Sequence, residues 1–132
     1  MTEKALMDAL VQMKRTGSLL NELEDVTRQI GEAIDRNDEV SLGMLVAMRE
    51  EPLAKLQAAD QAVRDQLEEL ADREEAAQLA AMLNGAPPAD PAVKTQQMLF
   101  EQVAANNRRL RQVLELDHRL SQRLYRKDSS GK

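Results

Sequence analysis

Glu115 and His118 are the residues whose types and spacing first suggest chemistry, because a Glu-x-x-His pair puts a carboxylate and an imidazole on one face of a helix. Di-iron carboxylate bundles use two such pairs together with glutamates from two other helices. This chain has one histidine and therefore no second pair. We expect no metal centre and no cofactor, and we place His118 on the surface.

Nucleophilic and acid–base catalysis have few candidates as well. The chain has no cysteine and no second histidine, and its few serines lie in turns, in the tail or beside leucines. The five glycines are isolated, so no phosphate-binding loop is present. We predict that the protein is not an enzyme.

The composition is that of long helices, since Ala, Glu, Lys, Leu and Arg make up about half of the 132 residues. With one Phe and one Tyr, any core must be aliphatic. The lack of cysteine is compatible with a reducing compartment. Because no stretch resembles a secretory signal or a membrane span, we expect a soluble, cytoplasmic protein without membrane insertion.

Charge is divided unevenly along the chain. Residues 1–107 hold 10 Lys and Arg against 20 Asp and Glu, a net of −10, whereas residues 108–127 hold 7 against 2, a net of +5. The C-terminal segment is thus a basic helix on an acidic body. The acidic body opposes attraction to phosphates, so we expect no nucleic-acid partner.

Apolar residues recur at steps of three, four or seven and predict three helices. Asp38 is the expected N-cap of the second helix, and Asp90 with Pro91 the expected start of the third. Short connections make neighbours antiparallel, so the predicted fold is an all-α, elongated, up-down-up three-helix bundle. The helices cover about 2–36, 39–83 and 91–126, in one domain of residues 1–127 followed by a disordered tail, 128–132.

Two residues test the continuity of these helices. Gly17 costs about 1 kcal/mol against Ala inside a helix, and we predict that the first helix is continuous or gently bent there. Pro52 lacks the N–H that would bond to Met48, so we expect a kink near residues 48–52.

Polar residues inside the apolar stripes need partners if they are buried. Ideal antiparallel pairing brings Gln66 of the second helix to the level of Asn107 of the third. One hypothesis is a polar layer between these two side chains that fixes helix register. The alternative is that Asn107 lies at the edge of the seam and is hydrated.

The last helix divides by angle into two arcs. Arginines gather on one arc, and the expected rim charges are Arg108, Arg111, Arg119 and Arg123. The apolar arc covers about 180°, wider than the ~100° stripe of an ordinary surface helix. This width suits either a helix packed between two neighbours or a surface that also binds a partner. Its members are Leu110, Val113, Leu114, Leu116, Leu120, Leu124 and Tyr125.

Two segments resemble FlgN-like flagellar export chaperones. The stretch "AIDRNDEVSLGMLVAMREEPLAKLQAAD" is similar to the family's polar turn and leucine-spaced second helix with its Arg/Glu element, here Arg49 and Glu50. The stretch "ANNRRLRQVLELDHRLSQRLYR" is similar to the family's last helix, with Asn107 a turn before the leucines and Tyr125 near the end. Pro52 and the prolines of the second connection have no place in the family pattern.

The resemblance implies a cytoplasmic chaperone for flagellar type III export. Such a protein binds the amphipathic terminal segment of a hook-filament junction subunit or of the filament cap, and delivers it to components of the export gate. The family's last helix carries these contacts, so the resemblance assigns partner binding to the seven apolar residues of the last helix, with the arginines as rim charges. The alternative is a self-associating coiled-coil adaptor, in which this helix closes a homodimer.

Overall fold

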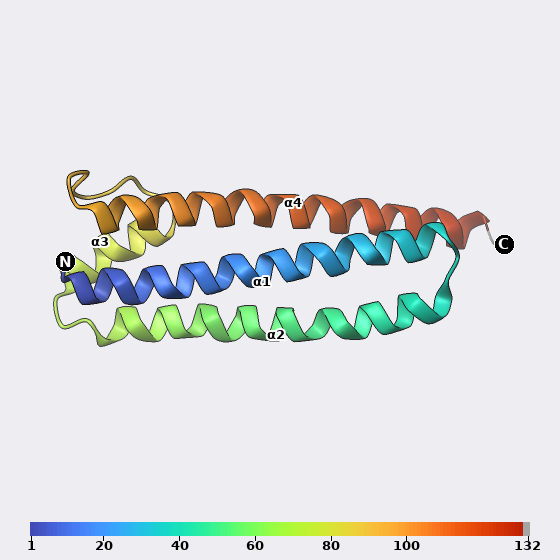
Figure 1. The fold of residues 1–132 in the computed structure, drawn as a ribbon, viewed down its shortest axis with the longest axis horizontal. Coiled ribbons are helices and arrows are strands. Elements are labelled where there is room, and N and C mark those ends of the chain that lie inside the picture. Colours follow the sequence, from blue (N-terminus) through green and yellow to red (C-terminus); the bar gives the residue numbers. More distant parts are fainter. Residues whose placement is uncertain (131–132) are drawn as a thin grey trace.

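A computed structural model describes the backbone of residues 1–130 and the side chains of residues 1–126. Within this range the chain forms four helices: α1 (Glu3–Asp35), α2 (Glu39–Glu69), α3 (Arg73–Leu83) and α4 (Lys94–Ser130). The three long helices run up, down and up along one elongated body, and the short α3 lies at the end where the chain begins (Figure 1). The prediction of an all-α fold is confirmed.

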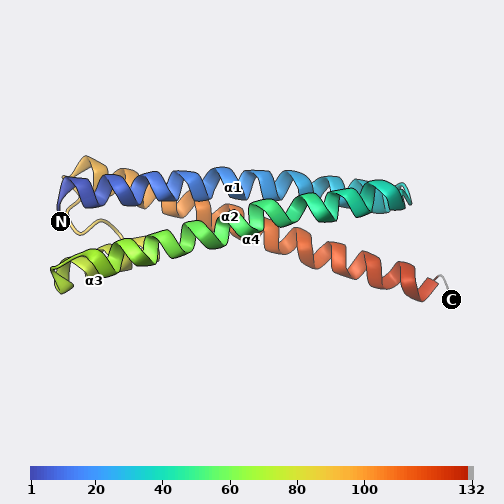
Figure 2. The ribbon, with the colours of Figure 1, turned by 90° about the horizontal axis from the view of Figure 1, so that it is seen from below.

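α1 is the central helix. It packs along both α2 and α4, whereas α2 and α4 approach one another much less. Fourteen residues of α1 are buried against only four of α2, because α1 is covered on two sides and α2 mainly on one. Figure 2 shows α2 and α4 crossing over the length of α1, so that they diverge at both ends.

The apolar interior is divided into two clusters. The turn-end core lies where α1 connects to α2, and the α3-end core lies where α3 joins the three long helices. The turn-end core contains Leu23, Val26, Ile30, Ala33, Ile34, Leu45, Val113 and Leu120. The α3-end core contains Leu6, Ala9, Leu10, Leu79, Met82, Leu99 and Val103.

The prediction of a single second helix over 39–83 is wrong, because this segment is two helices. Leu70 is extended, and Asp72 caps α3 by accepting hydrogen bonds from the backbone N–H groups of Glu74 and Glu75. Asp72 and Glu75 have the N-cap and N3 spacing of a capping box. The break turns α3 back along α2, which places a fourth helix at one end of the bundle.

The other helix ends follow local sequence signals. Asp38 caps α2 as predicted, and its hydrogen bonds from Ser41 hold the pKa of its carboxyl below the ordinary value. The stability that this cap gives the folded chain is therefore present above the ordinary carboxyl pKa and is lost as pH falls through the lowered pKa. α3 ends in a Schellman motif with Gly85 at φ +102°, where Gly85 N–H donates to Met82 O and Ala86 N–H to Ala81 O.

The start and the end of the last helix differ from the prediction. α4 begins at Lys94 and not near Pro91, because Asp90 accepts the N–H of Ala92 in a turn and donates its own N–H to the Gln96 side chain. The backbone of residues 128–130, expected in the tail, is helical. Residues 131 and 132 lie outside the described residues.

α2 continues through Pro52, and α1 continues through Gly17 as predicted. At Gly17, α1 lies against the side chains of Asn106 and Gln102 of α4. A Cβ at this position would lie 2.8 Å from Asn106 Oδ1 and 2.9 Å from Gln102 Nε2. The space is used by Asn106, whose Nδ2 donates to the Met13 carbonyl at 2.8 Å while its Oδ1 accepts from Gln102. This hydrogen-bonded contact therefore favours glycine at position 17, because a Cβ would displace both amides.

Substituting Gly17 and Gly43 by Ala should have opposite effects on stability. Both glycines lie inside long helices, but a Cβ at Gly43 meets nothing within 4 Å. Gly43→Ala should raise the free energy of unfolding by about 0.5–1 kcal/mol through helix propensity. Gly17→Ala should lower it by about 1 kcal/mol, because the Asn106 and Gln102 amides must move and lose hydrogen bonds. Urea unfolding of both variants measures the difference, and equal stabilisation would contradict the assigned role of Gly17.

Candidate binding groove

One face of α4 packs on α1 and belongs to the interior. Leu99 lies in the α3-end core, and Val113 and Leu120 lie in the turn-end core. Val113 and Leu120 were expected to bind a partner, but in this structure they hold α4 on α1. Leu116 is half-buried.

The next face of α4 is only partly covered. Its residues follow alternating steps of four and three, the spacing of a coiled-coil seam: Val103, Asn107, Leu110, Leu114, Asp117, Ser121 and Leu124. We call them the α4 seam. Val103 is buried in the α3-end core, but Leu110 is 42% and Leu114 58% exposed. The seam is thus covered at the end where α3 lies and open beyond it.

The open part of the seam borders a groove between α2 and α4. Its floor is α1, its walls are α2 and α4, and the C-terminal end of α3 closes one end. Its volume is about 510 Å³, within the ~300–1,000 Å³ range of ligand-binding pockets. Most of the lining is apolar: Met13, Thr16 and Leu20 of α1; Leu56, Asp60, Val63, Arg64 and Leu67 of α2; Ala80, Leu83 and Asn84 at the end of α3; Val103, Asn106, Asn107 and Leu110 of α4.

Beyond the groove, a salt bridge joins its two walls. Arg49 Nη2 of α2 lies 2.6 Å from Asp117 Oδ2 of α4, one turn along the seam from Leu114. The arginine and aspartate side chains are 26% and 34% exposed. Arg49 Nε is buried and has no hydrogen-bond partner. The groove therefore runs from the end of α3 towards an incompletely satisfied ion pair.

The expected polar layer between Gln66 and Asn107 is replaced by two other contacts. Gln66 donates its amide to the Ala5 carbonyl of α1 at 2.9 Å. Asn107 is exposed in the groove, as in the alternative of a hydrated edge, and has no hydrogen bond to Gln66. The buried amide is Asn106, because α1 and not α2 is the neighbour of α4 at this level.

The expected rim arginines have different roles. Arg123 binds both carboxylate oxygens of Asp35 and so holds α4 on α1, and Arg119 pairs with Glu115 on its own helix. Arg108 and Arg111 have no ion pair or hydrogen bond within the described side chains. Arg108 lines a second, polar groove between α1 and α4.

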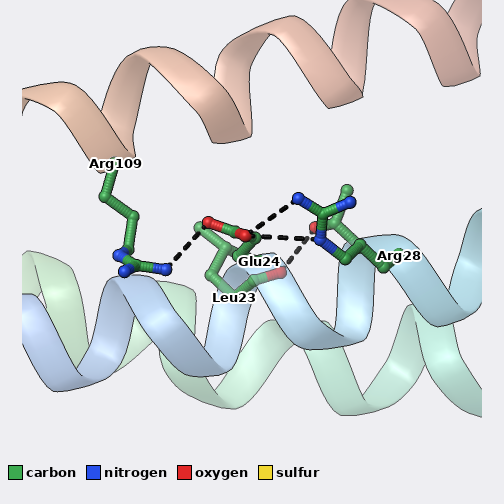
Figure 3. A network of polar contacts seen from close by, with 5 residues as sticks. Leu23, Glu24, Arg28 and Arg109 are labelled. Atoms are coloured by element: carbon green, nitrogen blue, oxygen red, sulfur yellow. Dashed lines mark hydrogen bonds and ion pairs between the residues drawn. The ribbon is translucent and has the colours of Figure 1, made fainter.

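A different arginine, Arg109, forms the most buried ion pair between two helices. Figure 3 shows the Glu24 carboxylate of α1 between Arg109 of α4 and Arg28 of α1. Arg109 Nη1 and Arg28 Nη2 both lie 3.0 Å from its oxygens, and the Glu24 side chain is only 11% exposed. This network fixes α4 along α1 on the side away from Leu110. This ion pair was not predicted from the sequence, although Glu24 lies close to the apolar residues Leu23 and Val26.

The groove offers shape and apolar surface rather than reactive groups. Within residues 1–126 no cluster of three or more His, Asp or Glu side chains could hold a metal ion. His118 is exposed, as expected. None of the described helices is both long and apolar enough to cross a membrane. Burial of the exposed leucines at the groove would be favourable.

Comparison with known proteins gives no relative, since no family model, no curated protein and no solved structure matches this chain.

Val113→Asp and Leu114→Asp should separate the two faces of α4. Val113 is 2% exposed, so an unpaired carboxylate there should cost several kcal/mol, about 3–5, and unfold much of the chain. Leu114 is 58% exposed, so the same substitution should change the free energy of unfolding by less than about 1 kcal/mol. Circular dichroism during thermal unfolding measures both. Equal destabilisation would show that the α4 seam is closed in solution.

Proposed function

We propose that this chain binds an amphipathic helix of another protein in the groove between α2 and α4. The main support for the proposal is that the groove continues the surface against which α3 packs. Leu79 and Met82 of α3 are buried beside Val103 of the α4 seam, and Leu110 lies on the same seam one step beyond the end of α3. A second helix in this position would cover Leu110 and Leu114 as α3 covers Val103.

α3 itself supports a helix as the bound element. It has 11 residues, which is too short for a stable helix in isolation, so its contacts with the bundle must hold it in shape. It buries Ala76, Leu79 and Met82 and exposes the opposite side. The surface at this end of the bundle therefore already holds one amphipathic helix, α3, through small and large apolar residues.

An extended peptide fits this site less well. An added strand needs free backbone donors and acceptors in the receptor, and the walls of this groove are helices whose backbone groups bond internally. A helix satisfies its own backbone and needs only apolar side chains at steps of three and four. The groove walls offer that spacing: Leu56, Asp60, Val63 and Leu67 on α2, and Asn107 and Leu110 on α4. Leu114 follows one step farther along the α4 seam.

The biological role that fits this binding mode is the one implied by the resemblance. We assign the chain as a FlgN-like, cytoplasmic chaperone that holds the amphipathic terminal segment of a hook-filament junction or cap protein and delivers it to the type III export gate. The support is the similarity of two segments and the open leucine seam on the last helix. In this assignment three long helices form the bundle, and α3 fills the fourth position over only part of its length.

A homodimer is the second candidate. The four–three spacing of the α4 seam is also that of a coiled coil, and Leu110, Leu114 and Leu124 are exposed along it. A second copy of α4 could cover them. Sedimentation of the wild-type chain across concentrations distinguishes the two, since only self-association predicts a dimer in the absence of cargo.

The test of the proposed function is Leu110→Ser with Leu114→Ser. The probe is the C-terminal segment of the hook-filament junction protein encoded in the same genome, followed by fluorescence anisotropy. Loss of two leucine contacts should weaken binding by at least about tenfold, with helicity unchanged. Val40→Ser with Met44→Ser is the matched control, because these residues are exposed on α2 outside the groove. Undiminished binding by the groove variant would refute the assignment.

A further inference from the structure

The guanidinium of Arg49 is only partly hydrogen-bonded. Its Nη2 contacts one oxygen of Asp117, while Nε is buried without a partner. A carboxylate that lies along this edge can accept from Nε and Nη2 in two parallel hydrogen bonds, which is the preferred geometry of Arg–carboxylate pairs. An unsatisfied buried donor costs free energy. The edge of Arg49 is thus a site for a better-placed carboxylate.

Arg111 is the second unsatisfied cation beside the groove. It follows Leu110 directly, is exposed, and has no ion pair or hydrogen bond within residues 1–126. Across the groove the situation differs, since Arg64 of α2 is paired with Asp60 of its own helix at 3.0 Å. The cationic groups left for a partner therefore lie at the far end of the groove and along its α4 side.

We propose that the helix bound in this groove is acidic, with one carboxylate that replaces Asp117 at Arg49 and another that pairs with Arg111. The inference rests on the proposed function, because it assumes that the groove binds a helix. In the free protein Asp117 occupies Arg49, and it joins α2 to α4 across the path that the helix would follow. Binding exchanges this intramolecular carboxylate for one from the partner.

The acid preference is local and opposes the charge of the whole chain. Residues 1–107 carry a net charge of −10, which repels an acidic peptide at a distance. At physiological ionic strength charges are screened beyond about 8 Å, whereas contacts with Arg49 and Arg111 act at hydrogen-bond distance. The preference should therefore persist at this salt concentration, where general attraction to basic surfaces weakens.

The test uses two synthetic helical peptides, each about 18 residues long, or five turns. Both carry leucines at steps of three and four, and they differ only in having Glu or Gln at the same flanking positions. Fluorescence anisotropy with the full chain at physiological salt should give about tenfold tighter binding of the Glu peptide, as expected for gained charge-assisted hydrogen bonds.

Variants of the chain test which residues cause the preference for the Glu peptide. Arg49→Gln with Arg111→Gln should reduce the Glu-to-Gln ratio to about one, and Asp117→Asn should raise affinity for the Glu peptide alone by several fold. Arg108→Gln is the matched control, because Arg108 is also an unpaired arginine of α4 but lines the polar groove on the other side. This control should retain the full ratio.

The outcomes separate the two proposals. Equal binding of both peptides by the wild-type chain overturns the acid preference and leaves helix binding intact. A ratio that survives in the Arg49 and Arg111 variant overturns the assignment of these residues. Binding of neither peptide overturns the acid preference together with the proposed function. A wild-type dimer that buries the α4 seam overturns both proposals in favour of a second copy in the groove.

Discussion

The structure depends on the burial of α1 on two of its sides. Because α2 and α4 each pack on α1, the central helix holds its two neighbours apart, and they approach one another much less than either approaches α1. In a regular three-helix bundle each helix packs on both others, and no groove remains. Here the interface between α2 and α4 is only partly filled. α3 occupies one end of it, and the Arg49–Asp117 pair crosses it farther along.

Polar contacts between α1 and α4 make this open arrangement specific. Apolar burial alone would let α4 slide or rotate on α1. Asn106 at Met13, Arg109 at Glu24 and Arg123 at Asp35 occur at successive levels along α1, so they fix both register and rotation. Asn106 and Glu24 are buried and require their partners, so a rotated α4 would leave both unsatisfied. The Arg123–Asp35 pair is exposed and contributes less. The rotation that they select places Leu110 in the groove lining and leaves Leu114 exposed beyond it.

Sequence periodicity is sufficient for the class of fold but not for the number of helices. The long helices and the stop at Asn84 and Gly85 follow from local signals, because capping and glycine conformation act within a few residues. The break at Asp72 also had a local signal, but the apolar pattern runs through it and conceals it. Asn106 could not be distinguished from Asn107, because which asparagine is buried depends on the rotation of α4 against α1. Likewise, the apolar arc of the last helix suits either packing in the bundle or binding a partner. Only the packing of α4 on α1 shows that Val113 is buried and Leu114 is exposed.

Asn107, a polar member of the α4 seam, disfavours closure of the groove. If α2 and α4 closed on each other, Asn107 would be buried and would require a hydrogen-bond partner there, whereas Asp117 already has Arg49 of α2 as its partner. A seam of leucines alone would favour collapse or uncontrolled self-association. The mixed seam keeps apolar surface available, and a helix bound there as proposed would have to offer polar groups at the matching positions.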